Sequence, residues 1–207
     1  MNRICIAGIG TEIGKTLVSA IIAESLQADY WKPIQAGNLE FTDSDCIRSL
    51  ISNERTVVHP ESYRLKLAAS PHAAAAAENT CIKLEELSIP ETKNILIIEL
   101  AGGLLVPLNE KILNIDLVKF MEAPVILVSK NYLGSINHTL MSIDICIRHG
   151  IDLLGIIFNG ERNKSTEDFI IEYSRLTCIG RINHEKEISK ETVKRYAGSL
   201  KEIVPIA

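Results

Sequence analysis

The start of the chain places a lysine and a threonine behind a glycine-rich turn. An apolar stretch at residues 3–8 leads into Gly14, Lys15 and Thr16. In such a turn the backbone N–H groups converge on an anion, the lysine reaches the terminal phosphates of a nucleotide, and the hydroxyl binds Mg²⁺. The usual spacing has a glycine where this chain has Ile9. We interpret the stretch as a nucleotide phosphate-binding loop; the alternative is an ordinary strand-to-helix turn.

A lysine and a glutamate end two further apolar stretches. Lys32 closes a predicted strand at 30–32, where it could neutralise an anionic substrate or a transferring phosphoryl group. Glu99 closes a predicted strand at 94–99, and a carboxylate at the end of so apolar a run needs a partner such as Mg²⁺. A solvated surface lysine and a structural salt bridge are the respective alternatives. We predict a substrate role for Lys32 and a metal role for Glu99.

Two aspartates open a predicted helix at 42–51. We predict Asp43 as the N-cap of that helix. Asp45 lies within the first turn and could reach a metal, although its position alone favours a cap or helix-dipole role.

Three turns carry weaker signals. Ser70-Pro-His72 precedes an alanine-rich helix, and His72 could contact a ligand. The turn 133–138 opens a long helix whose free N–H groups could hold a carboxylate. Asn159, followed by Gly160, has the donor and acceptor needed to read an adenine edge. Each of these could equally be a plain helix start or turn.

Strand-like and helical stretches alternate along the chain. We predict strands at 3–8, 30–32, 94–99, 123–129, 153–159 and 178–182, and helices at 15–27, 42–51, 70–79, 115–121, 135–149, 166–175 and 191–203. Continuously apolar strands are typical of a parallel sheet buried on both faces. The alternation predicts an α/β, doubly wound, mainly parallel sheet with helices on both faces, and ligands at the carboxyl ends of the strands. We expect residues 1–207 to form one domain, with 53–66 as a surface connection.

Composition excludes several classes of protein. The net charge of −4 and the lack of a basic block argue against nucleic-acid binding. No apolar run is long enough to span a membrane, and the N-terminus lacks a signal-peptide layout. The five cysteines are scattered and form no Cys-x-x-Cys pair, so we predict neither disulfides nor zinc, and most of them as buried thiols. These features suit a cytoplasmic protein.

Taken in order, the motifs resemble those of dethiobiotin synthetase, over residues 3 to about 182. The matching segments are Thr11-Glu-Ile-Gly-Lys-Thr16, Lys32-Pro33, Ser44-Asp45, Ser70-Pro-His72, Ala101-Gly-Gly103, Pro124-Val-Ile-Leu-Val128, Leu133-Gly134 and Ile136-Asn-His138. The resemblance implies a P-loop NTPase fold and an ATP- and Mg²⁺-dependent ligase that acts on 7,8-diaminononanoate and CO₂ or bicarbonate. In that family an amine forms a carbamate, ATP converts it to a carbamic-phosphoric anhydride, and the second amine closes the ring. Family members are homodimers with substrate at the interface.

The resemblance also implies site residues. Lys32, Lys15 and Thr11 would be catalytic, and Thr16, Asp45 and Glu99 would hold Mg²⁺. Contacts to ATP would come from Glu12, Ile13, Gly14, Lys15, Thr16, Leu17, Asp45, Glu99, Leu100, Ala101, Gly102, Asn159 and Gly160. Contacts to the diamine, some from the partner subunit, would come from Thr11, Glu12, Lys32, Ala36, Leu133, Gly134, Ser135, Ile136, Asn137 and Tyr173.

The chain departs from the family pattern at a few positions. Ala36 replaces a hydroxyl residue, Leu100 a glycine and Asn183 a proline, while Ile9 and Gly10 replace Thr-Asp. If the replaced glycine needs a positive φ, Leu100 would be strained. One alternative is a partitioning-type switch ATPase, but such proteins carry an additional lysine where this chain has Gly10. Others are a small-molecule kinase, which would need an arginine-rich lid, and a related ligase with a changed substrate.

Overall fold

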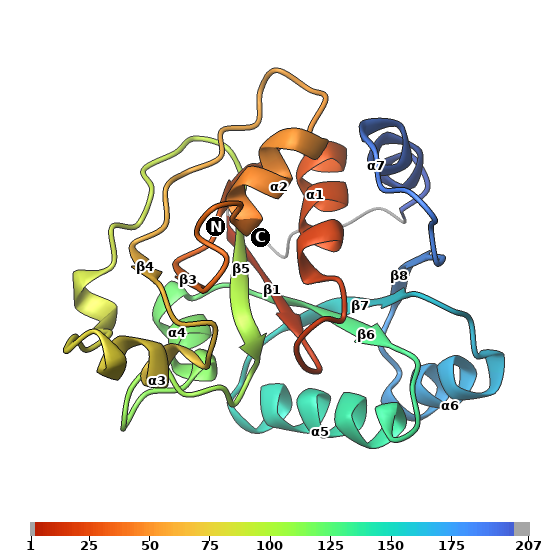
Figure 1. Ribbon diagram of the computed structural model, residues 1–207. Helices are drawn as coiled ribbons and strands as arrows, with labels where there is room; N and C mark the ends of the chain where they lie inside the picture. Colours follow the sequence, from red (N-terminus) through yellow and green to blue (C-terminus); the bar gives the residue numbers. More distant parts are fainter. Residues whose placement is uncertain (1–2, 201–207) are drawn as a thin grey trace.

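A six-stranded parallel sheet forms the centre of the protein. Figure 1 shows the computed structural model, in which residues 3–200 are described. The strand order is β2-β5-β1-β6-β7-β8, and every pairing is parallel. The strands are β1 (Arg3–Gly8), β2 (Asp29–Trp31), β5 (Leu96–Gly103), β6 (Val125–Lys130), β7 (Leu153–Asn159) and β8 (Cys178–Ile182). The predicted doubly wound fold is confirmed.

Helices cover both faces of this sheet (Figure 1). Three lie on one face, α1 (Lys15–Leu26), α2 (Asp43–Leu50) and α7 (Lys190–Ala197). Three lie on the other, α4 (Asn114–Met121), α5 (Ser135–Arg148) and α6 (Lys164–Ser174). Alternate residues of β1 therefore enter different cores: Ile4 and Ile6 pack towards α1, and Cys5 and Ala7 towards α4 and α5. Within residues 3–200, no helix has the length and apolar character needed to cross a bilayer.

A small second sheet lies beside the main one. Its strands β3 (Ile34–Ala36) and β4 (Tyr63–Leu65) pair in parallel, near α3 (Pro71–Ala77) and the short 3₁₀ turn η1 (Leu84–Glu86). Our prediction that 53–66 is irregular was wrong for β4. A three-residue strand is too short to show an apolar period, so the pattern could not reveal it.

Most element boundaries differ from prediction by one to four residues. Strand β5 runs four residues past its predicted end, to Gly103, because its glycine end still pairs with Gly8 of β1. Helix α6 begins at Lys164, since the Asn163 side chain accepts the Thr166 N–H as an N-cap. Helix α7 ends at Ala197; positions 201–203 of the predicted helix lie outside the described residues.

The cysteines differ strongly in access. Cys5 and Cys146 are fully buried, and burial raises the pKa of each thiol to about 12. At pH 8 roughly one in ten thousand of those groups would be thiolate, the reactive form. Cys81 is exposed. We therefore expect iodoacetamide to alkylate Cys81 in the native protein and to reach Cys5 and Cys146 only after unfolding, as measured by peptide mass spectrometry. Fast native alkylation of Cys5 would contradict this burial.

Candidate active site

The predicted phosphate loop connects β1 to α1. Gly14 is the N-cap of α1 with φ 91°, and Glu12 also adopts a positive φ of 57°. Lys15 is buried to 7% exposure, and its Nζ donates to the carbonyl of Gly10 at 3.0 Å. Burial lowers the pKa of Lys15 from 10.5 to about 8; nearby Glu99 opposes this shift and Lys32 adds to it. The lysine is thus folded over its own loop, where the phosphates of a nucleotide would lie.

The hydroxyl of Thr16 lies between two carboxylates. Its Oγ1 is 2.9 Å from Glu99 Oε1 and 3.0 Å from Asp43 Oδ1. A hydroxyl has one proton, so it can donate to only one of these oxygens, and the other contact brings two oxygens together. An oxygen-rich arrangement of this kind suits a hard divalent cation such as Mg²⁺. Within residues 3–200, no group of three or more His, Cys, Asp or Glu side chains could hold a metal ion. The protein groups available to a cation here are therefore two carboxylates and one hydroxyl.

Lys32 joins the same cluster from the end of β2. Its ammonium pairs with Asp43 and lies 3.6 Å from Glu99 Oε1. The hydroxyl of Tyr30 donates to Glu99 Oε2 at 2.9 Å, so both oxygens of this carboxylate, which is 1% exposed, are held in place. Burial and the charge of Glu99 raise the pKa of Tyr30, which keeps that hydroxyl protonated. Lys32 and Glu99, predicted separately, therefore meet beside the phosphate loop.

The structure corrects the roles of the two aspartates in α2. Thr42, not Asp43, is the N-cap, and Asp45 completes a capping box by accepting from the N–H and hydroxyl of Thr42. The other oxygen of Asp45 accepts from Arg48. In this structure the Asp45 carboxylate is used at the helix start, and its role as a metal ligand stays a prediction. Asp43, one residue into the helix, points to Thr16 and Lys32 instead.

Asn159 lies against the phosphate loop. Asn159 is the last residue of β7, and its side-chain Nδ2 donates to the carbonyl of Ile13 at 2.8 Å. A Cβ at Gly14 would overlap this amide, so the loop needs glycine there both for its positive φ and for space. Asn159 thus positions the loop, a contact that its sequence context did not indicate. Its carbonyl oxygen and second N–H proton remain available for a ligand.

A groove of about 360 Å³ runs from the loop to α5. Thr11 lines it, as do Leu105 and Val106, which follow β5, and His138 and Met141 of α5. Only Thr11 belongs to the predicted site. The α5 residues were missed, although His138, Met141 and Ile145 recur at three- and four-residue spacing and so share one helix face.

The turn before α5 presents apolar surface to solvent. Gly134 caps α5 with φ 100°, and Leu133 is completely exposed. Ser135 is buried, whereas the Asn137 amide contacts Met141 on the exposed side of the helix. Ile136 is half-buried against the core. The predicted substrate-binding turn is therefore a surface feature beside the groove.

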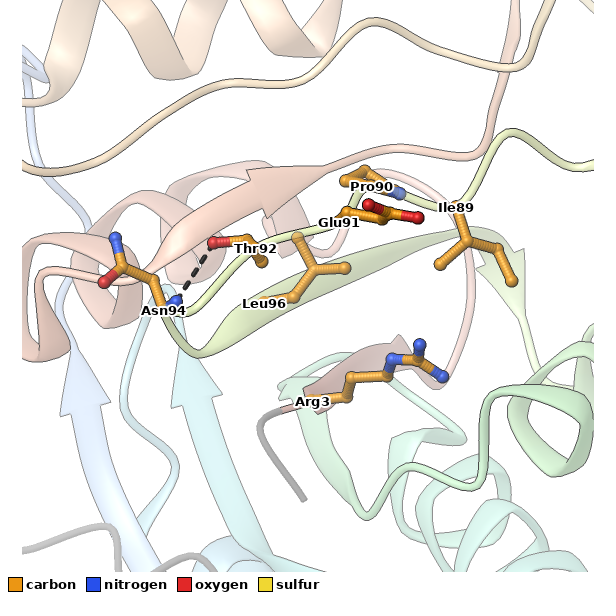
Figure 2. A pocket seen from close by; sticks show the side chains of 7 residues that line it. All are labelled: Arg3, Ile89, Pro90, Glu91, Thr92, Asn94 and Leu96. Carbon is orange, nitrogen blue, oxygen red and sulfur yellow. Dashed lines mark hydrogen bonds between the residues drawn. The ribbon is translucent and has the colours of Figure 1, made fainter.

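A second cavity of about 740 Å³ lies at the opposite edge of the sheet (Figure 2). Arg3 and Leu96, the first residues of β1 and β5, line it together with residues that precede β5. Ligands of open α/β sheets bind at the carboxyl ends of the strands, and the phosphate loop is at that end. We therefore place the candidate active site at the phosphate loop, with the groove beside it, and not in this larger cavity.

Curated proteins resemble this chain over almost its whole length. It is 49% identical to ATP-dependent dethiobiotin synthetase BioD of Cytophaga hutchinsonii over 201 residues, 97% of each chain. The chain belongs to the dethiobiotin synthetase family. The same-named protein of Chlamydia felis is 44% identical, over 97% of this chain and 94% of its own. Residues 2–192 also match the AAA domain family. Dethiobiotin synthetases are ATP-dependent ligases of biotin synthesis, and the resemblance predicted from the motifs is confirmed.

More distant proteins share only the fold. A ParA family ATPase from Chlorobium tepidum superposes with a TM-score of 0.59 at 12% identity, covering 97% of this chain and all of its own. MinD in a MinC–MinD complex of Aquifex aeolicus gives 0.56 at 14%, covering 94% and 86%. These proteins belong to the partitioning-type class that we weighed as an alternative. Their identity is too low to say more than that the P-loop architecture is shared.

The departures from the dethiobiotin synthetase pattern have different structural outcomes. Leu100 does not adopt a positive φ, and its side chain is fully buried in the core. The backbone strain expected for a leucine at a positive φ is therefore absent. The positive φ falls on Gly102, at 83°, while the carbonyl of Ala101 accepts from Asn114. Leu100 could contact a nucleotide only through its backbone.

Two more predicted substrate residues, Ala36 and Tyr173, lie on β3 and α6. Ala36 ends β3, half-buried, next to Gly37 at φ 76°. Tyr173 is near the far end of α6, 70% exposed, with its ring stacked on Phe169. Within one subunit the structure does not bring Tyr173 to the cluster of Lys32 and Glu99. The approach of α6 to another subunit would decide its role.

Proposed function

We propose that this chain converts 7,8-diaminononanoate, CO₂ and ATP into dethiobiotin, ADP and phosphate. The convergence of Lys32, Thr16 and two carboxylates beside the phosphate loop carries the proposal, together with the high identity to dethiobiotin synthetases. A switch ATPase needs a phosphate site, but it does not need a groove that extends from the loop along α5. The groove favours a small-molecule substrate.

The nucleotide phosphates would lie over the loop, against the N-terminal end of α1 and Lys15. Thr16, Asp43 and Glu99 would hold Mg²⁺, with phosphate oxygens and waters as its remaining ligands. When bound, Mg²⁺ would offset the negative charge on the phosphates during transfer. Asn159 would present its remaining amide atoms to the base.

The proposed reaction has three steps. One amine of the diamine adds to CO₂ and forms a carbamate. A carbamate oxygen attacks the γ-phosphorus, ADP leaves, and a carbamic-phosphoric anhydride forms. The second amine attacks the carbonyl carbon, closes the ring and expels phosphate. Lys32 would hold the carbamate against the γ-phosphate, and Thr11, at the mouth of the groove, would orient the amine end. Positioning and charge stabilisation provide most of the catalysis in such a transfer.

The substrate carboxylate would bind at the 133–137 turn of a partner subunit. Leu133, Met141 and Ile147 expose large apolar side chains on or beside α5, which is typical of a surface that is covered by another chain. A homodimer formed through this face would close the groove and supply backbone N–H groups for the carboxylate.

Phosphate release tests the proposed reaction. With ATP and Mg²⁺, we expect release to require both 7,8-diaminononanoate and bicarbonate, with dethiobiotin detected by mass spectrometry. Release without the diamine would instead indicate a switch ATPase. No release under any condition would mean that the site has lost this chemistry.

Restoring a hydroxyl at position 36 tests whether this departure from the family pattern affects substrate binding. We expect Ala36→Ser to be tolerated, because Ala36 is half-buried at the end of β3 and a serine adds only one atom. A new hydrogen bond worth about 1 kcal/mol would lower the KM for the diamine roughly fivefold. Steady-state kinetics would measure this, with the KM for ATP as the internal control. An unchanged KM for the diamine would show that this position does not contact the substrate.

A further inference from the structure

An ion pair between the half-buried Arg181 and the buried Glu167 joins β8 to α6 at the carboxyl edge of the sheet. Arg181 Nε lies 3.1 and 3.2 Å from the two carboxylate oxygens of Glu167, and Nη2 lies 3.1 Å from Oε1. The two side chains are 16% and 9% exposed. Nε therefore donates to both carboxylate oxygens, whereas Nη2 is close enough for an ion pair but makes no hydrogen bond. None of the proposed chemistry uses this pair.

The arginine also binds the backbone on both sides of the edge. Its Nη1 donates to the carbonyl of Gly160 at 3.1 Å and to Asn183 Oδ1 at 2.7 Å. A weaker contact reaches the carbonyl of Ile182 at 3.4 Å. Arg181 therefore links the segment that follows β7 to the segment that follows β8. Asn183, which departs from the family pattern, acts here as a partner for the arginine.

The glutamate extends the link to two more segments. Glu167 Oε1 accepts from Asn131 Nδ2 at 2.7 Å and from the Asn163 N–H at 3.3 Å. Asn131 follows β6, and its amide also donates to the carbonyl of Glu161 at 2.8 Å. One ion pair thus ties together the ends of β6, β7 and β8.

These segments lie on the side of the proposed nucleotide site where the base of ATP would bind. Glu99 and Lys32, which would face the terminal phosphate, come from β5 and β2, on one side of β1. Asn159, which touches the phosphate loop, comes from β7 on the other side of β1. A nucleotide laid across the loop therefore directs its base towards β7 and β8. Gly160, which Arg181 holds, is the next residue after Asn159.

We propose that Arg181 and Glu167 are positioning residues. They hold in place the ends of β7 and β8, where the base of the nucleotide would bind. This inference rests on the proposed use of ATP at the loop. The pair acts through Asn159, Gly160 and Asn183 and does not touch the phosphates. Its removal should weaken binding of ligands that carry a base and leave phosphate binding intact. A purely structural ion pair would instead lower the affinity for both kinds of ligand, or for neither.

Binding of ATP and of inorganic triphosphate, both with Mg²⁺, separates these cases. The variants are Glu167→Gln, which keeps the shape, Arg181→Met, which keeps the apolar stem, and Arg181→Lys, which keeps the charge. Lys164→Met on the exposed face of α6 is the control, because within residues 3–200 Lys164 pairs with Asp168 and does not contact the Arg181–Glu167 pair. Isothermal titration calorimetry gives each dissociation constant, and thermal unfolding shows whether each variant is folded.

We expect Glu167→Gln and Arg181→Met to raise the dissociation constant for ATP about tenfold, and Arg181→Lys to raise it less. The constant for triphosphate should change less than about twofold in every variant. Folded variants with unchanged ATP affinity, or with equal losses for ATP and triphosphate, would overturn the positioning role. Failure of the unmodified protein to bind ATP would instead refute the proposed function.

Discussion

Replacing Lys32 with alanine should reduce dethiobiotin formation by about 10²–10³-fold, the usual effect of losing one charge-stabilising group in a transfer reaction. Lys32 is the cation between Asp43 and Glu99, and in the proposed reaction it faces the carbamate and the γ-phosphate. Its loss leaves both carboxylates without that positive charge. The fold should persist, because Asp43 is partly exposed and Glu99 keeps its bonds to Tyr30 and Thr16.

The measurement is dethiobiotin formation at saturating ATP and diamine, alongside circular dichroism and thermal unfolding. Lys164→Met, which removes an exposed lysine far from the cluster, is the matched control and should retain full activity. Normal turnover by a folded Lys32→Ala protein would remove Lys32 from the mechanism. Loss of activity together with loss of helical signal would indicate unfolding, and Lys32→Met would then separate charge from volume.

The two aspartates of α2 give a sharper test of the metal site. We expect Asp43→Asn to weaken the apparent affinity for Mg²⁺ roughly 10- to 100-fold, as loss of a metal-site carboxylate does. Asp45→Asn should change that affinity little, because Asp45 bonds to Thr42 and Arg48 and not to Thr16. Both changes are isosteric and lie two residues apart, so each is a control for the other.

Magnesium titrations of activity and of ADP binding would measure the difference. The reverse order, with Asp45→Asn the more damaging change, would mean that α2 rearranges when the nucleotide binds and that the sequence-based prediction of Asp45 describes the loaded state. Equal effects would mean that the helix start and the metal cluster are coupled. Either result would reject the division of roles in this structure.

The parts of the fold and of the candidate site that depend on local residue patterns could be predicted from the sequence. The phosphate loop and Lys32 each follow a strand, and Glu99 follows the apolar run inside β5. Parallel strands bring their carboxyl ends to one edge, so the meeting of these residues could be predicted. The AAA domain match and the dethiobiotin synthetase relatives agree with that reading.

Other features depend on three-dimensional contacts that a sequence pattern does not predict. Asp43 and Asp45 are both acidic residues in one helical turn. Because Thr42 is the N-cap, Asp45 completes the capping box and Asp43 is left to contact Thr16 and Lys32. The contact of Asn159 with Ile13 joins residues 146 positions apart, and the pairing of Arg181 with Glu167 crosses from a strand to a helix. The short strands β3 and β4 exist only because they pair with each other.

The position of β1 has a consequence for how the chain folds during synthesis. Its neighbours in the sheet are β5 and β6, so Ile4 pairs with Ile97 and Cys5 with Val125. Strand β1 therefore leaves the ribosome before either of these partners, and about a hundred further residues are made before β5 can pair with it. Until then we expect α1 or a chaperone to shield its apolar side chains. The phosphate loop is attached to this strand, so we expect nucleotide binding to stabilise the chain most after β5 and β6 have been added.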